Sequence, residues 1–435
     1  GIVKNLNIYE GTIIGNTRVG GIAGASNGKI MNCTNKATII AQDNENTYSG
    51  QLVGGIVGVV VNKGSIDNCK NYGNVTAKDD SLTLGKGKFA GGIVGQVYVG
   101  AEEDITVSNC TNSGTIIAIY QDVGGIVGCS MRKEGLTNKI TIKNCNNSGK
   151  VSTGDSEKLT TVCAGGIVGV VNTETIIDNC TNSGNITATM QKAGGIVGSQ
   201  ESGKGEIKNC TNNGYITTSN GGIGGIIGTI NTETIIDNCI NNGNLMAKSM
   251  MGGIVGRQNA GTIKNCTNNG EIRAIGSGAG GIGGYLAAGT LDNCINNGNI
   301  TVENQIVGGM VARQATGTIK NCTNNGSIIA GKQQAGGIAG QQEAGKINNC
   351  TNKGEIISNA KEKRGISGGI VGLQNGGSIN SVYNSGLVKT KNYSDDTIDA
   401  LGGIVGQQSD TGVISKAYNK GQFDGGDVIG GIVGQ

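Results

Sequence analysis

Residues 252–279 read GGIVGRQNAGTIKNCTNNGEIRAIGSGA, and this stretch recurs along the whole chain. It contains a Gly-Gly-Ile-Val-Gly block followed by an Ile-x-Asn-Cys-Thr-Asn-x-Gly-x-Ile block. Copies of the first block begin at Gly20, Gly54, Gly91, Gly124, Gly165, Gly194, Gly224, Gly252, Gly280, Gly308, Gly336, Gly368, Gly402 and Gly430. Four consecutive starts, from Gly252 to Gly336, are 28 residues apart. A fixed period of this size is typical of a solenoid.

Each period holds three short runs that favour β-structure, at residues 253–255, 262–264 and 271–273, separated by Gly, Asn or Ala. Such short runs, bounded by turn residues, predict three sides of a coil rather than a hairpin sheet. We therefore expect an all-β fold, a single three-sided parallel β-solenoid of about 14 coils with a 28-residue core period. Right-handed winding is favoured because parallel crossovers are right-handed. Residues 1–19 form an incomplete first coil, and residues 20–435 form one continuous solenoid.

Aliphatic side chains recur at three positions of every period and predict the core. One row lies three residues before the Cys position, one lies six after it, and one is the Ile of the glycine block, which changes only at Met310. We expect the paired glycines to turn a corner with positive φ and to let neighbouring backbones approach closely. A phosphate-binding loop is a poor alternative, because that motif occurs once and opens a helix.

Composition excludes several classes of protein. The 435 residues include 82 Gly but no Pro, Trp or His, with only 2 Phe and 10 Tyr. A net charge of +3 without a basic stripe argues against nucleic acid as a partner. No apolar run is long enough to span a membrane, and the first residues lack the order of a secretion signal. The chain lacks an initiator Met and starts and finishes partway through a repeat, so we expect a processed or partial piece of a longer protein.

Eleven of the 13 cysteines occupy one repeat position. They are Cys33, Cys69, Cys110, Cys145, Cys180, Cys210, Cys239, Cys266, Cys294, Cys322 and Cys350. Buried thiols packed in a column, disulfides and metal ligands are three possible roles. Packing is favoured because the apolar residues Val382 and Ala417 replace Cys in the last two coils. In-register Cβ atoms are also about 4.8 Å apart, which is beyond the usual range for a disulfide. Cys129 and Cys163 lie off the column and are either reactive or incidental.

The residue two positions before Cys alternates in charge over seven coils. It reads Lys143, Asp178, Lys208, Asp237, Lys264, Asp292 and Lys320. Stacked coils would pair each Lys with Asp above and below, so a slip by one coil would oppose like charges. Duplication of coil pairs without selection on charge is an equal alternative. The Asn residues around each Cys are expected to form stacked amide ladders at the corner.

The Gly-Ile-Val-Gly of each block, with the Asn-Cys or Asn-x-x-Asn-x-Gly corner after it, resembles the GLUG-motif repeat over nearly the whole chain. GLUG repeats resemble segments of large bacterial secreted and cell-surface proteins, among them non-catalytic regions of immunoglobulin-cleaving metallopeptidases and adhesin-like proteins. The resemblance implies an extracellular bacterial origin and no catalytic residues. The His-Glu-x-x-His zinc site of those peptidases is impossible here because the chain has no His.

These observations predict a non-enzymatic extracellular rod, part of a surface stalk, adhesin or filament, with no cofactor or metal. Its ends would meet another copy head to tail or continue in the same chain. Insertions concentrated in residues 78–162 and 358–400 mark a possible protein-binding face. A column of reduced thiols outside the cell would favour an anaerobic habitat. A polysaccharide lyase or hydrolase is the alternative, and an ice-binding solenoid is a weaker one.

Overall fold

The computed structural model describes residues 1–42, 51–78, 88–119, 122–154, 162–189, 192–219, 222–248, 250–276, 278–331, 333–359, 365–390, 399–409 and 411–435. Contacts divide the chain into two compact units. Unit 1 comprises residues 1–221 and 226–234, and unit 2 comprises residues 222–225 and 235–435. The described residues contain β-strands and no α-helix.

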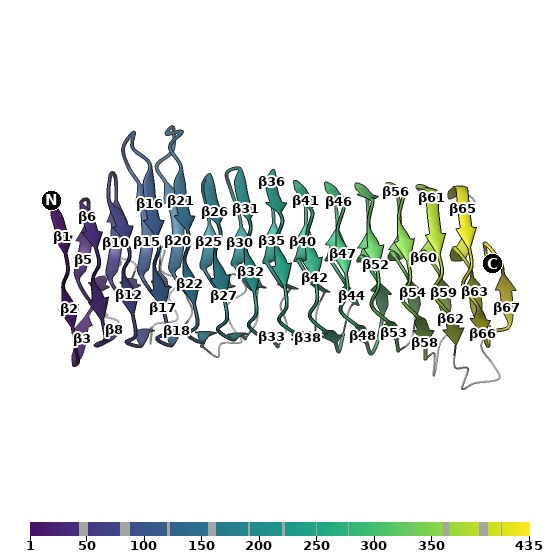
Figure 1. Ribbon diagram of the computed structural model, residues 1–435, viewed down its shortest axis with the longest axis horizontal. Helices are drawn as coiled ribbons and strands as arrows, with labels where there is room; N and C mark the ends of the chain where they lie inside the picture. The colour runs from purple at the N-terminus through teal and green to yellow at the C-terminus, as the bar shows by residue number, and fades with distance from the viewer. Residues whose placement is uncertain are drawn as a thin grey trace. The chain divides into compact units, whose positions relative to one another are not determined.

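The turns contribute short strands to four parallel sheets, here named A to D (Figure 1). A turn has five strands, except near the C-terminus of unit 2, where the single strands β61 (Ser378–Asn384) and β65 (Val413–Asn419) each replace the two sheet A strands. In the turn that follows Gly252, strand β40 (Val255–Gln258) lies in sheet D, β41 (Thr262–Lys264) and β42 (Thr267–Asn268) lie in sheet A, and β43 (Ile272–Ala274) lies in sheet B. The next strand, β44 (Gly278–Gly280), lies in sheet C. The runs predicted at 262–264 and 271–273 are present as β41 and β43. The run predicted at 253–255 falls instead on the corner between β39 (Met251–Gly252) and β40, and only Val255 lies in a strand. The corners at the glycine block and at Cys therefore subdivide the turn further.

Equivalent strands of unit 1 stack side by side in parallel. Sheet A contains β1 (Ile2–Lys4), β6 (Lys29–Met31), β11 (Ser65–Asp67), β16 (Ile105–Ser108), β21 (Ile140–Lys143), β26 (Thr175–Asp178) and β31 (Gly205–Lys208), and after the corner β2 (Asn7–Ile8), β7 (Thr34–Asn35), β12 (Lys70–Asn71), β17 (Thr111–Asn112), β22 (Asn146–Asn147), β27 (Thr181–Asn182) and β32 (Thr211–Asn212). Sheet B contains β3 (Thr12–Gly15), β8 (Thr38–Ala41), β13 (Val75–Ala77), β18 (Ile116–Ala118), β23 (Val151–Thr153), β28 (Ile186–Ala188) and β33 (Ile216–Thr218). Sheet C contains β4 (Arg18–Gly20), β9 (Leu52–Gly54), β14 (Phe89–Gly91), β19 (Asp122–Gly124), β24 (Ala164–Gly165) and β29 (Ala193–Gly194). Sheet D contains β5 (Ala23–Ser26), β10 (Val57–Val61), β15 (Val94–Val99), β20 (Val127–Arg132), β25 (Val168–Val171), β30 (Val197–Gln200) and β35 (Ile227–Ile230).

Unit 2 repeats the arrangement. Its sheet A contains β36 (Thr234–Asp237), β37 (Ile240–Asn241), β41, β42, β46 (Thr290–Asp292), β47 (Ile295–Asn296), β51 (Thr318–Lys320), β52 (Thr323–Asn324), β56 (Lys346–Asn348), β57 (Thr351–Asn352), β61 (Ser378–Asn384) and β65 (Val413–Asn419). Sheet B contains β38 (Leu245–Ala247), β43, β48 (Ile300–Val302), β53 (Ile328–Ala330), β58 (Ile356–Ser358), β62 (Val388–Thr390) and β66 (Phe423–Asp424). Sheet C contains β34 (Ile223–Gly224), β39 (Met251–Gly252), β44, β49 (Ile306–Gly308), β54 (Gln334–Gly336), β59 (Ile366–Gly368), β63 (Ala400–Gly402) and β67 (Val428–Gly430). Sheet D contains β40, β45 (Gly283–Leu286), β50 (Val311–Gln314), β55 (Ala339–Gln342), β60 (Val371–Gln374) and β64 (Val405–Gln408).

The parallel solenoid predicted from the repeat is confirmed. The sheet D strands number 13 among the described residues, so the chain makes about 13 turns against the 14 coils expected. The predicted aliphatic rows form the core: Ile263, Ile272 and Ile254 of one turn are fully buried, and exposure appears only in the first and last turns, as at Ile432. Burial of each such side chain contributes about 1.5 to 3 kcal/mol.

The glycine block lets backbones approach, as expected, but does not turn with positive φ. A Cβ on Gly281 would lie 2.1 Å from Gly309 O and 2.3 Å from Asn296 Cγ, and neither Gly280 nor Gly281 has positive φ. The left-handed conformation falls instead on the Asn before each Cys, with φ from 49° to 56°. Asn tolerates this conformation through local hydrogen bonds of its side chain. The expectation of positive φ in the glycine block was therefore wrong.

The predicted insertions lie partly outside the described residues, which omit 79–87, 120–121, 155–161, 360–364 and 391–398. Residues 1–19 contribute β1, β2 and β3, which stack on the next turn, and the first two residues of β4.

Candidate functional site

The corner after each Asn-Cys pair is joined to its neighbours by a buried ladder of asparagine amides. The Asn two residues after Cys donates one Nδ2 hydrogen to the carbonyl two residues later and the other to Oδ1 of the same Asn in the following turn. Asn296, for example, is fully buried, accepts from Asn268 at 2.8 Å, and donates to Asn324 at 2.8 Å and to Gly298 O at 2.9 Å. This confirms the stacked amides expected from sequence, here called the inner ladder.

The inner ladder runs through each unit with one direction. In unit 1 it links Asn35, Asn71, Asn112, Asn147, Asn182 and Asn212. In unit 2 it links Asn241, Asn268, Asn296, Asn324, Asn352, Asn384 and Asn419. Every bond is donated toward the C-terminus. The second glycine of the block packs on these amides, which explains why the two motifs recur together.

A second, exposed row is formed by the Asn that precedes Cys, and its bonds run the opposite way. Asn68 donates to Asn32, and Asn144 donates to Asn109. We call a turn with Asp two residues before the Cys position an Asp coil, and one with Lys there a Lys coil. In the turn that follows an Asp coil, the acceptor is this Asp instead of an Asn. Thus Asn109 donates to Asp67, and the same contact recurs at 2.7 to 2.8 Å from Asn209 to Asp178, Asn265 to Asp237 and Asn321 to Asp292.

The alternating Lys and Asp residues stack as the register predicts, with Lys143 beside Asp178, Asp178 beside Lys208, and Lys264 beside Asp292. Ion pairs join Lys264 to Asp237 and Lys320 to Asp292, each at 3.2 Å and each with the Asp of the preceding turn. Lys208 instead pairs with Glu206 on its own strand at 3.1 Å. Asp237 and Asp292 therefore divide their oxygens: at Asp292, Oδ1 accepts from Asn321 and Oδ2 faces Lys320.

In each Asp coil, the Asn directly after the corner Gly also forms a hydrogen bond with the following turn. Its Oδ1 accepts a backbone N–H, from Thr115 to Asn74, Tyr215 to Asn185, Glu271 to Asn244 and Ser327 to Asn299, at 2.9 to 3.1 Å. An Asp coil thus offers the next turn two side-chain acceptors that a Lys coil does not. The alternation of Asp and Lys coils seen in the sequence therefore has a basis in hydrogen bonding.

All eleven cysteines of the column are buried and form no disulfide. Each Sγ lies 3.0 to 3.4 Å from the carbonyl oxygen two residues before it. Several reach a second carbonyl of the preceding turn, such as Cys294 to Ile263 O at 3.7 Å. Burial raises the pKa of Cys266 well above that of an exposed thiol. A neutral, desolvated thiol such as that of Cys266 is a poor nucleophile and a poor metal ligand.

Cys129 and Cys163 lie outside the column in a hydrophobic cluster of unit 1, here called the side cluster. Its buried members are Leu52, Val59, Phe89, Cys129, Cys163 and Val170. Leu52 and Phe89 begin strands of sheet C, and Cys163 directly precedes one. Val59, Cys129 and Val170 lie in sheet D, each followed by a fully buried residue, namely Val60, Ser130 and Val171. This cluster was not predicted from the sequence, although Val170 stands at a sheet D register where unit 2 has Arg313 and Gln341.

A polar network adjoins the side cluster. Asp122 accepts the backbone N–H of Cys163 at 2.7 Å, and burial raises the pKa of Asp122 to about 7. Lys192 contacts Glu201 at 2.5 Å, and Glu201 also accepts from Ser199 and Asn231 at 2.6 Å each. Burial alone would raise the pKa of Glu201, but these donors lower it overall. Burial, with the Asp122 carboxylate, raises the pKa of both Cys129 and Cys163.

Two described insertions of unit 1 lie on adjacent turns, after β15 and after β20 (Figure 1). Asp104 accepts from the backbone N–H of Lys139 at 2.8 Å and so ties them together. Residues 101–104 and 133–135 are exposed and carry both charges.

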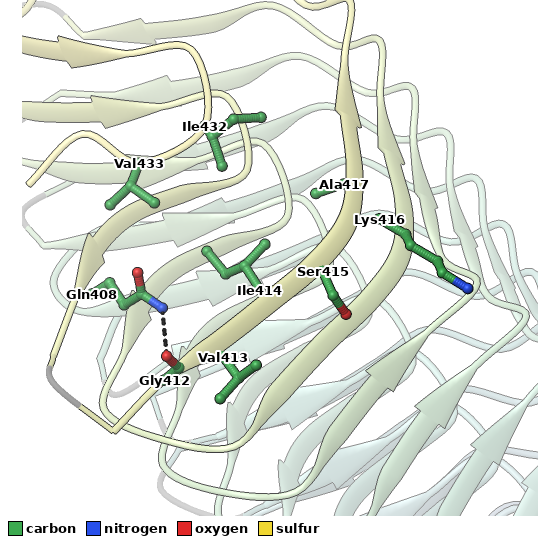
Figure 2. Close-up of a pocket in the computed structure, with 9 residues that line it drawn as sticks. All are labelled: Gln408, Gly412, Val413, Ile414, Ser415, Lys416, Ala417, Ile432 and Val433. Carbon is green, nitrogen blue, oxygen red and sulfur yellow. Dashed lines mark hydrogen bonds between the residues drawn. The ribbon is translucent and has the colours of Figure 1, made fainter.

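The last turn of unit 2 leaves part of the solenoid interior open. A pocket of about 510 Å³ lies between β65 and residues 432–433, and Figure 2 shows Ile414 directed toward Ile432 and Val433 while Lys416 points away. Gln408 donates to Gly412 O at 2.8 Å at its edge. Ile414 and Ala417 occupy the core and cysteine rows of the preceding strand.

Within the described ranges, no three Cys, Asp or Glu side chains converge in a way that would hold a metal ion. A search of the same residues for a helix long and apolar enough to cross a membrane found none.

Comparison with known proteins gives two matches. The GLUG motif model matches residues 15–40 and 249–273, which confirms the resemblance at two places in the chain. Halomucin of Haloquadratum walsbyi is 26% identical over 263 residues, covering 47% of this chain and 3% of halomucin. The chain therefore corresponds to a small part of that relative. No solved structure matches.

Proposed function

We propose that these GLUG-motif turns form a section of a non-catalytic, extracellular bacterial rod that belongs to a surface stalk, adhesin or filament. The coarser description, a repeat protein with a solenoid fold and no identified catalytic family, rests on the fold and the GLUG match. The similarity to part of halomucin supports a surface or secreted repeat protein.

The observation that carries the proposal is that the recurring polar residues bond to one another from turn to turn. Asn268, Asn296 and Asn324 use their amides within the ladder, and Cys294 uses its thiol on backbone carbonyls. Residues consumed in this way support length and rigidity. Specificity is then left to the residues that vary.

The varied residues support a protein partner at the insertions within 78–162. The described parts, residues 101–104 and 133–135, are exposed and bear mixed charges on neighbouring turns. Proteins complement such patterns better than polyanions do. Further solenoid turns, of the same chain or of another copy, are the second kind of partner, because equivalent strands of successive turns pair in parallel throughout each unit.

Surface exposure on intact cells of the source organism tests the proposed location. An antibody raised against this chain should label the outside of unpermeabilised cells or their secreted matrix, and added protease should remove the label. Labelling that requires permeabilisation, or an antigen that protease reaches only after lysis, would overturn the proposal.

A further inference from the structure

We infer that Arg257, Tyr285 and Arg313 on sheet D of unit 2 form a binding site for the carboxylate groups of an acidic polysaccharide. These three side chains are here called the Arg-Tyr-Arg row. The row lies on a surface other than the insertions described above, and the inference does not depend on where in the organism the chain is located.

The Arg-Tyr-Arg row occupies one register of three successive turns. Arg257 on β40 pairs with Tyr285 on β45, and Tyr285 pairs with Arg313 on β50. The residue that follows each member is buried, whereas Arg257 is exposed and the other two members are half-buried. Since neighbouring parallel strands lie about 4.8 Å apart, the two arginines leave the backbone about 10 Å apart along the stack.

The tyrosine ring holds both guanidinium groups in place. The Cζ atom of Arg257 lies 4.8 Å from the centre of the Tyr285 ring, and the Cζ atom of Arg313 lies 5.8 Å from it. A guanidinium group is attracted to the face of an aromatic ring, and this contact uses none of its N–H groups. Both arginines are therefore positioned without losing hydrogen-bond donors to the ring.

The two guanidinium groups differ in what they already bind. Arg257 donates Nε–H to Asn259 Oδ1 at 2.8 Å, and its Nη1 and Nη2 have no partner among the described residues. Arg313 donates Nε–H to Glu343 Oε1 at 2.6 Å and also pairs with this carboxylate through Nη2. The charge of Arg257 is thus the one in the row that no carboxylate of the described chain balances.

Small residues leave the row accessible from solvent. In the turns of Tyr285 and Arg313, the residues two positions later are Ala287 and Ala315. Gly278 begins β44, the strand before β45, at the register where the side cluster of unit 1 has Leu or Phe. A ligand can therefore approach the tyrosine hydroxyl and the Nη groups without displacing a large side chain.

The donors of the row match a chain of sugar acids. A guanidinium with two free Nη groups binds a carboxylate through two parallel hydrogen bonds, and a phenol hydroxyl can donate to or accept from a sugar hydroxyl. The arginines lie two turns apart, so one carboxylate does not reach both, and a chain that carries several does. Protein interfaces bury an apolar core, but the large exposed hydrophobic residues in the described part of unit 2 lie outside sheet D, as Ile240 and Ile295 do on sheet A.

The test is to titrate the full 435-residue chain with an oligogalacturonate in a calorimeter, and to repeat the titration with the uncharged methyl ester of the same sugar. We expect the acid to bind and the ester not to bind. Arg257→Gln should weaken binding at least about tenfold, because it removes the unbalanced charge and the paired Nη donors. Arg273→Gln is the matched control, because it removes the same charge from β43 of the same turn, where Arg273 is exposed and already pairs with Glu303 at 3.2 Å. It should change the dissociation constant by less than about twofold.

A second variant tests the ring. Tyr285→Leu retains both arginines but removes the surface that positions them, and it should weaken binding at least about threefold. Circular dichroism on each variant shows whether the solenoid is retained. No binding of the oligogalacturonate by the unchanged chain, equal losses from Arg257→Gln and Arg273→Gln, full binding by Tyr285→Leu, or equal binding of the methyl ester would each overturn the inference. Tighter binding of a sulfated oligosaccharide or of a glutamate peptide, with the same dependence on Arg257, would overturn the choice of ligand.

Discussion

Removal of one inner ladder amide should destabilise unit 2 far more than removal of its exposed neighbour. Asn296 is fully buried, whereas Asn297 is exposed, although each has amide bonds of 2.8 Å to both adjacent turns. Asn296→Ala and Asn297→Ala therefore remove the same atoms from two ladders that differ in access to water.

The magnitude follows from the groups left without partners. Asn296→Ala leaves three groups without this partner: one Nδ2 hydrogen of Asn268, Oδ1 of Asn324 and the carbonyl oxygen of Gly298. An unsatisfied buried group costs about 1 to 3 kcal/mol, and water entering the vacated space recovers part of this. We expect the free energy of unfolding of unit 2 to fall by about 3 to 5 kcal/mol, and by less than about 1 kcal/mol for Asn297→Ala, where water replaces the lost bonds.

Urea unfolding followed by far-UV circular dichroism measures both changes, and hydrogen exchange with mass spectrometry shows whether the loss of protection centres on residues 281–324. A difference between the two variants below about 1 kcal/mol, with equal urea dependence, would refute the assignment of stability to the buried amides.

Three further predictions follow from the buried thiols, the raised pKa and the charge ladder. All 13 thiols are buried, so native protein should show almost no rapid reaction with a thiol reagent, whereas 13 groups should react in denaturant; fast labelling of the native state would contradict the packing role. The pKa of Asp122 is raised from 3.8 to about 7, so the folded state binds a proton that the unfolded chain has lost, and the stability of unit 1 should fall as pH rises from about 4 through 7. Asp122→Asn should remove about 2 to 4 kcal/mol of this dependence in urea titrations at pH 5 and 8, and an unchanged slope would argue against burial as its cause. Asp292→Lys would place three Lys side chains in register, from Lys264 to Lys320, and should lower stability by about 1 kcal/mol, less in high salt; a loss that does not depend on salt would point to the lost Asn321 bond instead.

The course of the chain could be predicted from sequence because its core rows contain only apolar residues. Ile263 and Ile272 are buried as expected, and the repeat spacing implies the register that brings each next to its equivalent in the following turn. The division of each turn into five strands could not, because it depends on how Gly281 packs against the Asn296 amide. Both Gly and Asn favour positive φ, so composition alone did not show that Asn takes it.

The sequence predicted which kinds of polar contact form, but not which residues are the partners in each contact. Stacking of Asp and Lys was read correctly from the spacing, yet the carboxylate of Asp237 is shared between Lys264 and the corner Asn265. That sharing depends on a side-chain position that a period does not specify. The side cluster went unnoticed because its residues belong to two corners of variable length. The available signal was apolar Val170 at the sheet D register where unit 2 has Arg313 and Gln341.

The opposed directions of the amide rows have a consequence for growth. Inside each unit the buried asparagines point their dipoles one way along the stack, while exposed pairs such as Asn293 to Asn265 and Asn297 to Asn269 point theirs the other way. Dipoles aligned in a single sense would sum to a field that strengthens with length, as in an α-helix. Here each of these windings adds a buried amide bond in one direction and exposed amide bonds in the other. The opposed rows therefore reduce the field that would otherwise build up along the axis with each added winding.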